Sequence, residues 1–448
     1  LVRFTIDLST AKNVLYCEEY PSSHLFICSL SLSFQSKTQT SSSSSGSKLS
    51  AEQILEIREQ IQLRSGNETV LNEELFGPVQ PDTIVIAVQV HNRLEYLRHL
   101  IVSLAQARDI DSVLLIFSHD YFDEDINQLI TTIDFCKVMQ IFYPHSLQTH
   151  PHSFPGESLG DCPRDTKPED KCVGTPDLYK HYREARFTQT KHHWWWKANN
   201  EKWLPGKFCL KLYFHGCHFT FYLIRMIVFL ALFSYFYSVC VCKSFIRLYC
   251  YITWHNWGDV EVTQWVSSKH NMGFAFNHSV WQQIKACSTK FCDHDDYNWD
   301  WSLLHVSNTC LTQKLHTLVL RAPRVFHIGE CGVHHKKKDC SSRAVLIKVH
   351  RALQAGQRTL FPRQLVVVHT PPKKVKKHKG NGGWGDKRDH ALCRSFSVST
   401  SPDSNIINSL VIMGSMVSNS SINSSTLKPY NDTVPDILDN RHGYSCSD

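Results

Sequence analysis

Short apolar runs alternate with amphipathic stretches in the first third of the chain, and this alternation predicts the centre of the fold. Three runs are apolar almost throughout and are bounded by polar or turn-forming residues, as buried parallel strands are: residues 83–90, 113–117 and 138–142. The stretches between them have helical spacing: residues 94–107, with Leu97, Leu100, Ile101 and Leu104 on one face, and residues 126–133. The pattern predicts an open, doubly wound α/β sheet that binds ligands at the carboxyl ends of its strands.

The segments on either side of this pattern are less regular. Residues 41–47 are serine except for Gly46, a composition typical of a flexible linker. Residues 51–63 have helical spacing, and Asn67-Glu-Thr69 is an acceptor sequence for N-glycosylation. We therefore expect residues 1–79 to be a stem-like or unrelated, mostly flexible segment with no visible signal or anchor. A single folded domain would cover residues 80–395, and residues 396–448 would form a disordered tail.

One interval interrupts the domain. Residues 203–258 contain no Asp or Glu, and residues 219–242 are apolar except for Arg225 and a few hydroxyl side chains. The length of this stretch suits a membrane span. Because it lies inside an α/β pattern, we favour a buried core helix over a span.

Composition narrows the classes of protein. With 448 residues, 42% hydrophobic and 20% charged, the chain is neither fibrous nor disordered as a whole. A net charge of +7 is modest for this length, and we expect no nucleic-acid partner. The 17 Cys and 26 His suit either a disulfide-bonded secretory protein or a metal protein.

Residues 293–301, Asp-His-Asp-Asp-Tyr-Asn-Trp-Asp-Trp, give the strongest chemical signal. Carboxylates this close together repel one another unless a cation or hydrogen-bond donors neutralise them, and one of them is a natural general base. The alternative is an acidic turn or a helix N-terminus. His327, with Glu330, His334 and His335 after it, has ligand types that suit manganese or zinc. Residues 381–386 have the composition of a flexible loop that could close over a ligand.

Several segments together resemble the N-acetylglucosaminyltransferase II family over residues 80–197 and 256–395. They are Gln89-Val-His-Asn-Arg93, Phe117-Ser-His-Asp120, His181-Tyr-Arg-Glu-Ala-Arg-Phe187, Gln189-Thr-Lys-His-His-Trp-Trp-Trp196, His270-Asn-Met-Gly273, Asp295-Asp-Tyr-Asn-Trp-Asp-Trp301, Phe326-His327, His334-His-Lys-Lys337 and Asn381-Gly-Gly-Trp-Gly-Asp386. The resemblance implies a GT-A-type, Rossmann-like mixed sheet with flanking helices. It also implies inverting transfer of N-acetylglucosamine from UDP-GlcNAc to the 2-hydroxyl of the alpha-1,6 mannose of N-glycans.

The resemblance also implies residue roles. Asp300 would be the catalytic base, and His327 would be a ligand of the Mn2+ cofactor. The nucleotide sugar would be bound by Gln89, Val90, His91, Asn92, Arg93, Asp120, Gln189, Thr190, Lys191, His192 and His193. Four disulfides are implied by matching positions: Cys162–Cys172, Cys287–Cys310, Cys292–Cys393 and Cys331–Cys340. Cys136 matches a family position without a partner.

The implied partners are UDP-GlcNAc, an N-glycan acceptor on glycoproteins and the Golgi membrane, with the catalytic domain in the lumen. A type II membrane anchor is expected from the family but is not seen in residues 1–79. The oligomeric state stays open, a homodimer being one option.

The chain departs from the family pattern in the apolar interval. The family has a Glu-Glu-Asp motif there whose Asp is the principal manganese ligand, whereas residues 198–257 hold an atypical apolar insert without it. Three interpretations are open: translated non-coding sequence, an inactive splice form or copy, and a true membrane span. The alternatives to a transferase are accordingly a catalytically inactive glycan-binding homologue and an integral membrane protein of another function.

Overall fold

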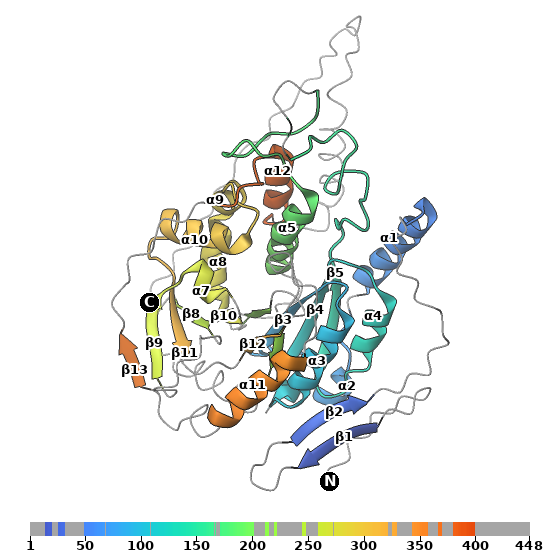
Figure 1. Ribbon diagram of the computed structural model, residues 1–448, viewed down its shortest axis with the longest axis vertical. Helices are drawn as coiled ribbons and strands as arrows, with labels where there is room; N and C mark the ends of the chain where they lie inside the picture. The colour runs from blue at the N-terminus through green and yellow to red at the C-terminus, as the bar shows by residue number, and fades with distance from the viewer. Residues whose placement is uncertain are drawn as a thin grey trace, which may run out of the picture. The chain divides into compact units, whose positions relative to one another are not determined.

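A computed structural model gives the fold of the chain (Figure 1). It describes residues 14–19, 26–31, 49–67, 69–107, 109–164, 166, 171–200, 211–214, 219–221, 244–247, 259–271, 273–320, 325–328, 343–356, 366–369 and 380–398.

The described strands form a nine-stranded mixed sheet. In spatial order it contains β13 (Val366–His369), β9 (Asp259–Gln264), β11 (His316–Leu320), β8 (Ser244–Arg247), β10 (Phe274–Phe276), β6 (Lys211–Phe214), β3 (Val85–Val90), β4 (Leu114–His119) and β5 (Lys137–Phe142). Strands β6, β3, β4 and β5 are parallel to one another, and β10 runs antiparallel to both of its neighbours. Two pairs lie outside this sheet: β1 (Val14–Glu19) with β2 (Phe26–Ser31), and β7 (Phe219–Phe221) with β12 (Val325–His327).

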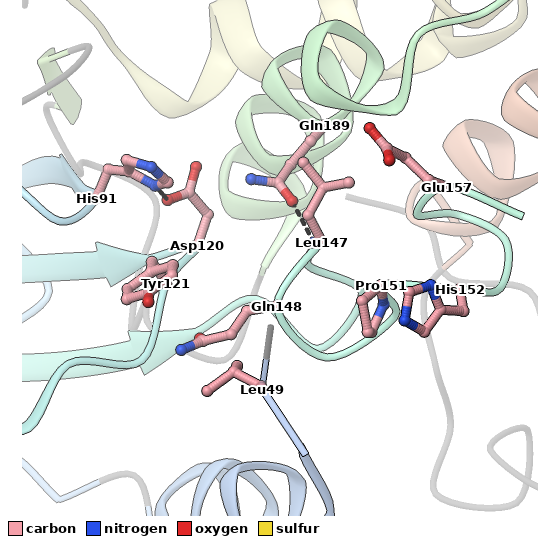
Figure 2. Close-up of a pocket in the computed structure, with 10 residues that line it drawn as sticks. All are labelled: Leu49, His91, Asp120, Tyr121, Leu147, Gln148, Pro151, His152, Glu157 and Gln189. Carbon is pink, nitrogen blue, oxygen red and sulfur yellow. Dashed lines mark hydrogen bonds and ion pairs between the residues drawn. The ribbon is translucent and has the colours of Figure 1, made fainter. Parts of the chain in front are cut away.

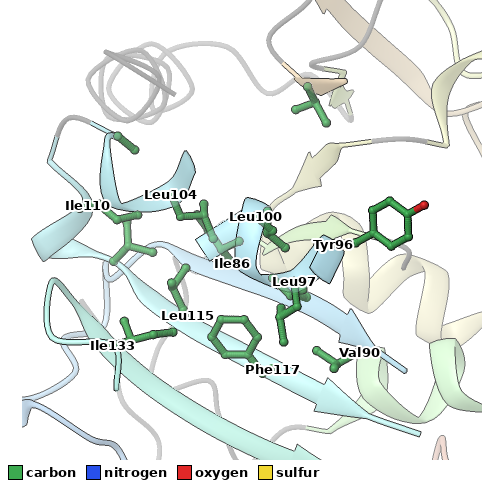
Figure 3. Packing of buried hydrophobic residues seen from close by; sticks show 14 of the residues in the cluster. Ile86, Val90, Tyr96, Leu97, Leu100, Leu104, Ile110, Leu115, Phe117 and Ile133 are labelled. Atoms are coloured by element: carbon green, nitrogen blue, oxygen red, sulfur yellow. The ribbon is translucent and has the colours of Figure 1, made fainter. Parts of the chain in front are cut away.

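Alternate residues of β3 enter different hydrophobic cores, because successive side chains of a strand point to opposite faces. Ile86 and Val90 pack on one face against α3 (Leu94–Ala105) (Figure 3). Helices α4 (Glu124–Thr131) and α11 (Arg343–Gly356) contribute side chains to the same core. Helix α3 buries Leu97, Leu100 and Leu104 there, as its spacing predicts. The apolar runs are therefore strands covered by a helical layer.

Ala87 belongs to a second core, which is built mainly of aromatic side chains. Its helices are α5 (Ala185–Asn199), α8 (His278–Ala286), α9 (Ser288–Cys292) and α10 (Trp299–Thr309). Trp194 of α5 stacks on Trp299 of α10 with ring centroids 4.5 Å apart, and Trp195 stacks on Phe291 at 4.0 Å. Short α7 (Ser267–His270) and α12 (Lys387–Ser395) pack against α10 and α5 respectively.

The chain before β3 contributes α1 (Ala51–Gly66) and α2 (Glu73–Phe76), and a 3-10 helix, η1 (Ile110–Ser112), precedes β4. Helix α1 packs along β5, and Leu71 forms an antiparallel bridge with Val138 of β5. Residues 49–79 are thus attached to the same folded unit as the sheet.

The mixed α/β prediction is confirmed, and the elements expected between residues 83 and 142 lie where the pattern placed them. Of residues 219–242, the structure describes only β7, which is a strand, so the expected core helix is wrong for residues 219–221. Strands β6 and β8 lie on either side of that stretch in sequence. Residues 222–242 of the candidate span lie outside the described residues. No helix in the described part of the chain is both long and apolar enough to cross a membrane.

Candidate functional site

A cavity of about 380 Å³ lies beyond the carboxyl ends of β3, β4 and β5 (Figure 2). It is lined by Leu49, His91, Asp120, Tyr121, Leu147, Gln148, Pro151, His152, Glu157 and Gln189. His91 directly follows β3, and Asp120 directly follows β4. The parallel sheet therefore brings together polar side chains from two separate motifs, at the edge where such sheets bind ligands.

Asp120 joins two histidines. His91 Nδ1 lies 2.7 Å from Asp120 Oδ1, and His193 Nδ1 lies 3.3 Å from Oδ2. Behind them, His193 Nε2 is 2.7 Å from Ser118 Oγ, and the ring of Tyr143 stacks on His193. This chain of contacts fixes the carboxylate and leaves the partly exposed imidazole of His91 at the cavity.

The charges of this group follow from those contacts. Burial by itself raises the pKa of Asp120, but hydrogen bonds from His193 and His91 hold it well below its usual value. Burial lowers the pKa of His91, yet the hydrogen bond to Asp120 and its negative charge leave that pKa above its usual value. The pKa of His193 is lowered, mainly by burial. A carboxylate thus supports a readily protonated His91, while His193 stays neutral.

Two glutamines hold the loop after β5, which lines the cavity. Gln189 Oε1 accepts a hydrogen bond of 2.6 Å from the backbone N–H of Leu147, which ties α5 to the loop after β5. Gln148 accepts from the N–H of Phe122 at 2.6 Å and donates to the Phe122 carbonyl at 2.9 Å. These contacts fix the loop that closes the cavity, and Gln148 belongs to no motif that the sequence had singled out.

The other residues that the resemblance assigns to the nucleotide sugar do not line this cavity. Helix α5 carries three of them, Lys191, His192 and His193, and their side chains are fully buried. Strand β3 carries Gln89 and Val90, which are also buried. Lys191 donates to the carbonyls of His294 and Asp296, both at 3.0 Å, and His192 Nε2 lies 2.9 Å from Asp389 Oδ1. Asn92 and Arg93 are exposed, and Thr190 is half-buried. The motif Gln189–His193 therefore presents Gln189 to the cavity and uses its basic residues to pack the domain.

Asp300, the expected base, lies in the first turn of α10 and is almost completely buried. Ser267 Oγ and Asn271 Nδ2 each donate a hydrogen bond of 2.8 Å to its Oδ2 atom. Burial raises the pKa of Asp300, and the two hydrogen bonds offset only part of that effect. A carboxylate with a raised pKa binds a proton more readily, which is what general-base catalysis requires.

The neighbouring carboxylates have a structural role. Asp295 accepts the N–H groups of Leu178 and Trp384, at 2.7 and 3.2 Å, and Asp296 accepts that of Asn381 at 3.0 Å. Backbone N–H groups thus neutralise part of the acidic segment. From the sequence, either a cation or hydrogen-bond donors could have done so. These contacts, and the burial of Trp384, hold residues 381–386 against the acidic segment, and closure over a ligand stays a prediction.

A manganese site is not assembled in the described part of the chain. Within it, no three His, Cys, Asp or Glu side chains are grouped as metal ligands. His327 ends β12 with an exposed side chain, and Glu330, His334 and His335 lie outside the described residues. The described residues do not fit the metal that the resemblance implies.

Among the residues that the structure describes, three disulfides are present: Cys162–Cys172, Cys287–Cys310 and Cys292–Cys393. They are three of the four pairs that the resemblance implies, while Cys331 and Cys340 lie outside the described residues. Cys136 is a buried free thiol.

Sequence reasoning missed the residues that support these two sites. Ser267 and Asn271 hold Asp300, and only Asn271 lies in a segment that had been singled out, without a role. Leu49 and Tyr121 line the cavity, yet neither stands in a chemical motif. Their positions depend on packing between distant segments, which no local pattern expresses.

Comparisons of the sequence with a family profile and with individual proteins point to the same family. The sequence profile of the N-acetylglucosaminyltransferase II family matches residues 58–209 and 231–393. The alpha-1,6-mannosyl-glycoprotein 2-beta-N-acetylglucosaminyltransferase of Sus scrofa is 39% identical over 347 residues, covering 74% of this chain and 77% of the relative. The proteins of that name from Homo sapiens and Arabidopsis thaliana are 38% and 32% identical, covering 74% and 73% of this chain and 77% of each relative. The match thus begins inside α1 and includes part of the apolar interval.

Comparison with solved structures gives weaker matches. S. aureus TarS 1-349 has a TM-score of 0.29 and 9% identity, with 54% of this chain and 61% of that chain covered. Its complex with UDP-GlcNAc has the same score and identity, with coverages of 62% and 68%. A likeness at this level carries no argument about function.

Proposed function

The chain belongs to the N-acetylglucosaminyltransferase II family, and from this we propose that it transfers N-acetylglucosamine from UDP-GlcNAc to an N-glycan. The acceptor atom is the 2-hydroxyl of the alpha-1,6 mannose, and the anomeric centre is inverted. By family the chain is a glycosyltransferase.

The cavity is the observation that supports this proposal most directly. His91, Asp120 and Gln189 come from three separate sequence motifs, and all three line it. They offer an imidazole, a carboxylate and an amide, groups that form hydrogen bonds with the hydroxyls and ring edges of a nucleoside. Uridine and its ribose are therefore bound at the ends of β3 and β4.

The transfer step needs a base on the acceptor side. Asp300 takes the proton of the mannose 2-hydroxyl as the oxygen attacks the anomeric carbon, and the bond between that carbon and the diphosphate oxygen breaks. UDP leaves with the electron pair of that bond. The raised pKa of Asp300 suits this proton transfer.

Manganese is the cofactor that the resemblance implies, and when bound it would neutralise the departing diphosphate. The described residues contribute His327 but no group of ligands around it. We assign no step of the reaction to the metal.

We place the protein in the Golgi lumen. The three disulfides support an oxidising compartment, where such bonds form and persist. Resistance of the epitope-tagged catalytic domain to protease in sealed Golgi vesicles, with digestion after detergent, tests this location. Digestion in sealed vesicles would contradict it.

The enzymatic proposal is tested by UDP release from UDP-GlcNAc in the presence of a mannose-terminated N-glycan. Asp300→Asn should reduce release roughly 10²- to 10⁴-fold, the usual contribution of a general base. Asp293→Asn is the matched control, because Asp293 belongs to the same acidic segment but is partly exposed and paired with Arg394. Equal release by both variants would remove Asp300 from the role of base.

A second candidate function is binding of the sugar nucleotide or glycan without turnover. The absence of Asp and Glu from residues 203–258 favours it, because the acidic metal motif of the family is missing. UDP binding by a purified chain that releases no UDP from UDP-GlcNAc would support this candidate over the transferase.

A further inference from the structure

The wall of the cavity includes a residue from the segment that precedes the sheet in sequence. Leu49 is half-buried and lines the cavity together with Tyr121 and Gln148. Figure 2 shows it across the cavity from Gln189, just before the first turn of α1. Its aliphatic side chain therefore contacts the space that the proposed function assigns to uridine.

The position of Leu49 is fixed by the capping of α1. Ser50 is the N-cap residue: its Oγ atom accepts the N–H of Gln53 at 3.2 Å, and the Gln53 side chain accepts the N–H of Ser50 at 2.9 Å. Such a reciprocal capping box satisfies two backbone donors at the helix N-terminus and so fixes the residue at which the helix begins. Leu49 is thus held at the start of a defined helix.

Helix α1 is itself anchored to the cavity wall. Arg58 Nε donates a hydrogen bond of 2.8 Å to the carbonyl of Thr149, in the same loop as Leu147 and Gln148. Arg64 forms an ion pair with Glu124 at 3.1 Å and lies over the ring of Phe122. Ile61 is buried beneath the helix. These contacts bind α1 to the loops after β4 and β5, which form the cavity.

We propose that Leu49 and α1 form a wall of the donor pocket, Leu49 as a contact for the nucleobase of UDP and Arg58 as a positioning residue. This inference rests on the proposed function for the identity of the ligand. The planar face of a nucleobase is largely apolar, and Leu49 with the ring of Tyr121 supplies the apolar surfaces that such a face buries. Leu49 and α1 lie in the segment that the sequence predicts to be stem-like, and by this proposal they belong to the binding site.

The test is isothermal titration calorimetry, which measures the affinity of the whole 448-residue chain for UDP. Leu49→Ala should weaken binding roughly fivefold, because it removes apolar surface at the ligand without removing a hydrogen bond. Arg58→Ala should weaken binding as well, and Arg58→Lys, which keeps one donor for the Thr149 carbonyl, should restore part of it. Leu55→Ala is the matched control, since Leu55 is on α1 and is 56% exposed.

In turnover assays Leu49→Ala and Arg58→Ala should raise the KM for UDP-GlcNAc and leave kcat and the acceptor KM unchanged. A merely destabilising substitution would instead lower the melting temperature and the active fraction, and so lower kcat. UDP binding by Leu49→Ala that equals that of the unsubstituted chain would overturn this inference alone. Failure of the unsubstituted chain to bind UDP would overturn the proposed function and this inference with it.

Discussion

Asp300 shows how a single carboxylate is tuned by opposed effects. Burial raises its pKa, while Ser267 and Asn271 donate hydrogen bonds to its Oδ2 atom and lower the pKa in part. Both donors come from the α7 region, so the proposed base is positioned by a segment more than twenty-five residues before it in sequence. A change at either donor should alter the proton affinity of Asp300 without touching the carboxylate.

Asn271→Ala should move the acid limb of the pH–rate profile to higher pH. Without the Asn271 donor the pKa of Asp300 rises further, and the base becomes protonated, and therefore inactive, at a higher pH than before. The shift should be about one to two pH units, because a hydrogen bond to a charged group contributes about 1.5–3 kcal/mol and one unit corresponds to about 1.36 kcal/mol. The measurement is kcat/KM for UDP release as a function of pH.

Asn308→Ala serves as the control for that profile. Asn308 lies on α10, the same helix as Asp300, but is exposed. Its substitution should leave the acid limb in place. If the acid limb is also unchanged in Asn271→Ala, then Asp300 is not the group whose protonation the pH–rate profile reports.

Among the elements, the segment around residues 380–384 is fixed by carboxylates far away in sequence. Asp177 Oδ2 accepts the N–H of Gly383 at 2.6 Å, and Asp296 accepts that of Asn381. Gly382 has φ +68°, and a Cβ atom there would lie 2.0 Å from Asp177 Oδ2. The loop therefore needs glycine both for its backbone conformation and for its close approach to Asp177.

Gly382→Ala should lower the free energy of unfolding by at least about 2 kcal/mol, since left-handed strain alone costs about 1–2 kcal/mol. The measurement is urea denaturation without reductant. Gly66→Ala provides the comparison: Gly66 ends α1 with nothing within 4 Å of its added Cβ, so stability should stay equal or rise by up to about 1 kcal/mol. Equal stability of the two variants would contradict the tight packing of this loop.

Elements with a clear local pattern could be predicted from sequence, whereas contacts between distant segments could not. Strands β3, β4 and β5 are buried on both faces, so their apolar runs identify them directly. Helix α5 is buried around most of its surface, so its periodicity does not indicate which side faces the cavity. The backbone partners of Asp295, and Asn381 as a partner of Asp296, lie more than eighty residues away in sequence, and no local pattern can show them.

Across the whole molecule, α5 connects the two halves of the candidate site. Its Gln189 reaches the cavity at the ends of β3 and β4, and its Trp194 stacks on Trp299, the neighbour of Asp300. The sequence could predict the sheet edge, and the resemblance names Asp120, which lines the cavity there. The role of Asp300 as base stays a prediction. It could not predict that Lys191 and His192 serve the core, because a motif gives residue types and not the directions in which they point.

For the chain as a whole, UDP binding should depend little on manganese. Residues 203–258 carry no carboxylate, the described residues hold no metal cluster, and the cavity is lined by groups that can form hydrogen bonds with a nucleoside. UDP affinity measured by titration in EDTA should therefore stay within about twofold of that measured with manganese, a difference below about 0.4 kcal/mol. His327→Ala should leave both values unchanged. A tenfold gain in affinity with manganese that His327→Ala removes would instead place a metal site at the end of β12, completed by residues beyond those described.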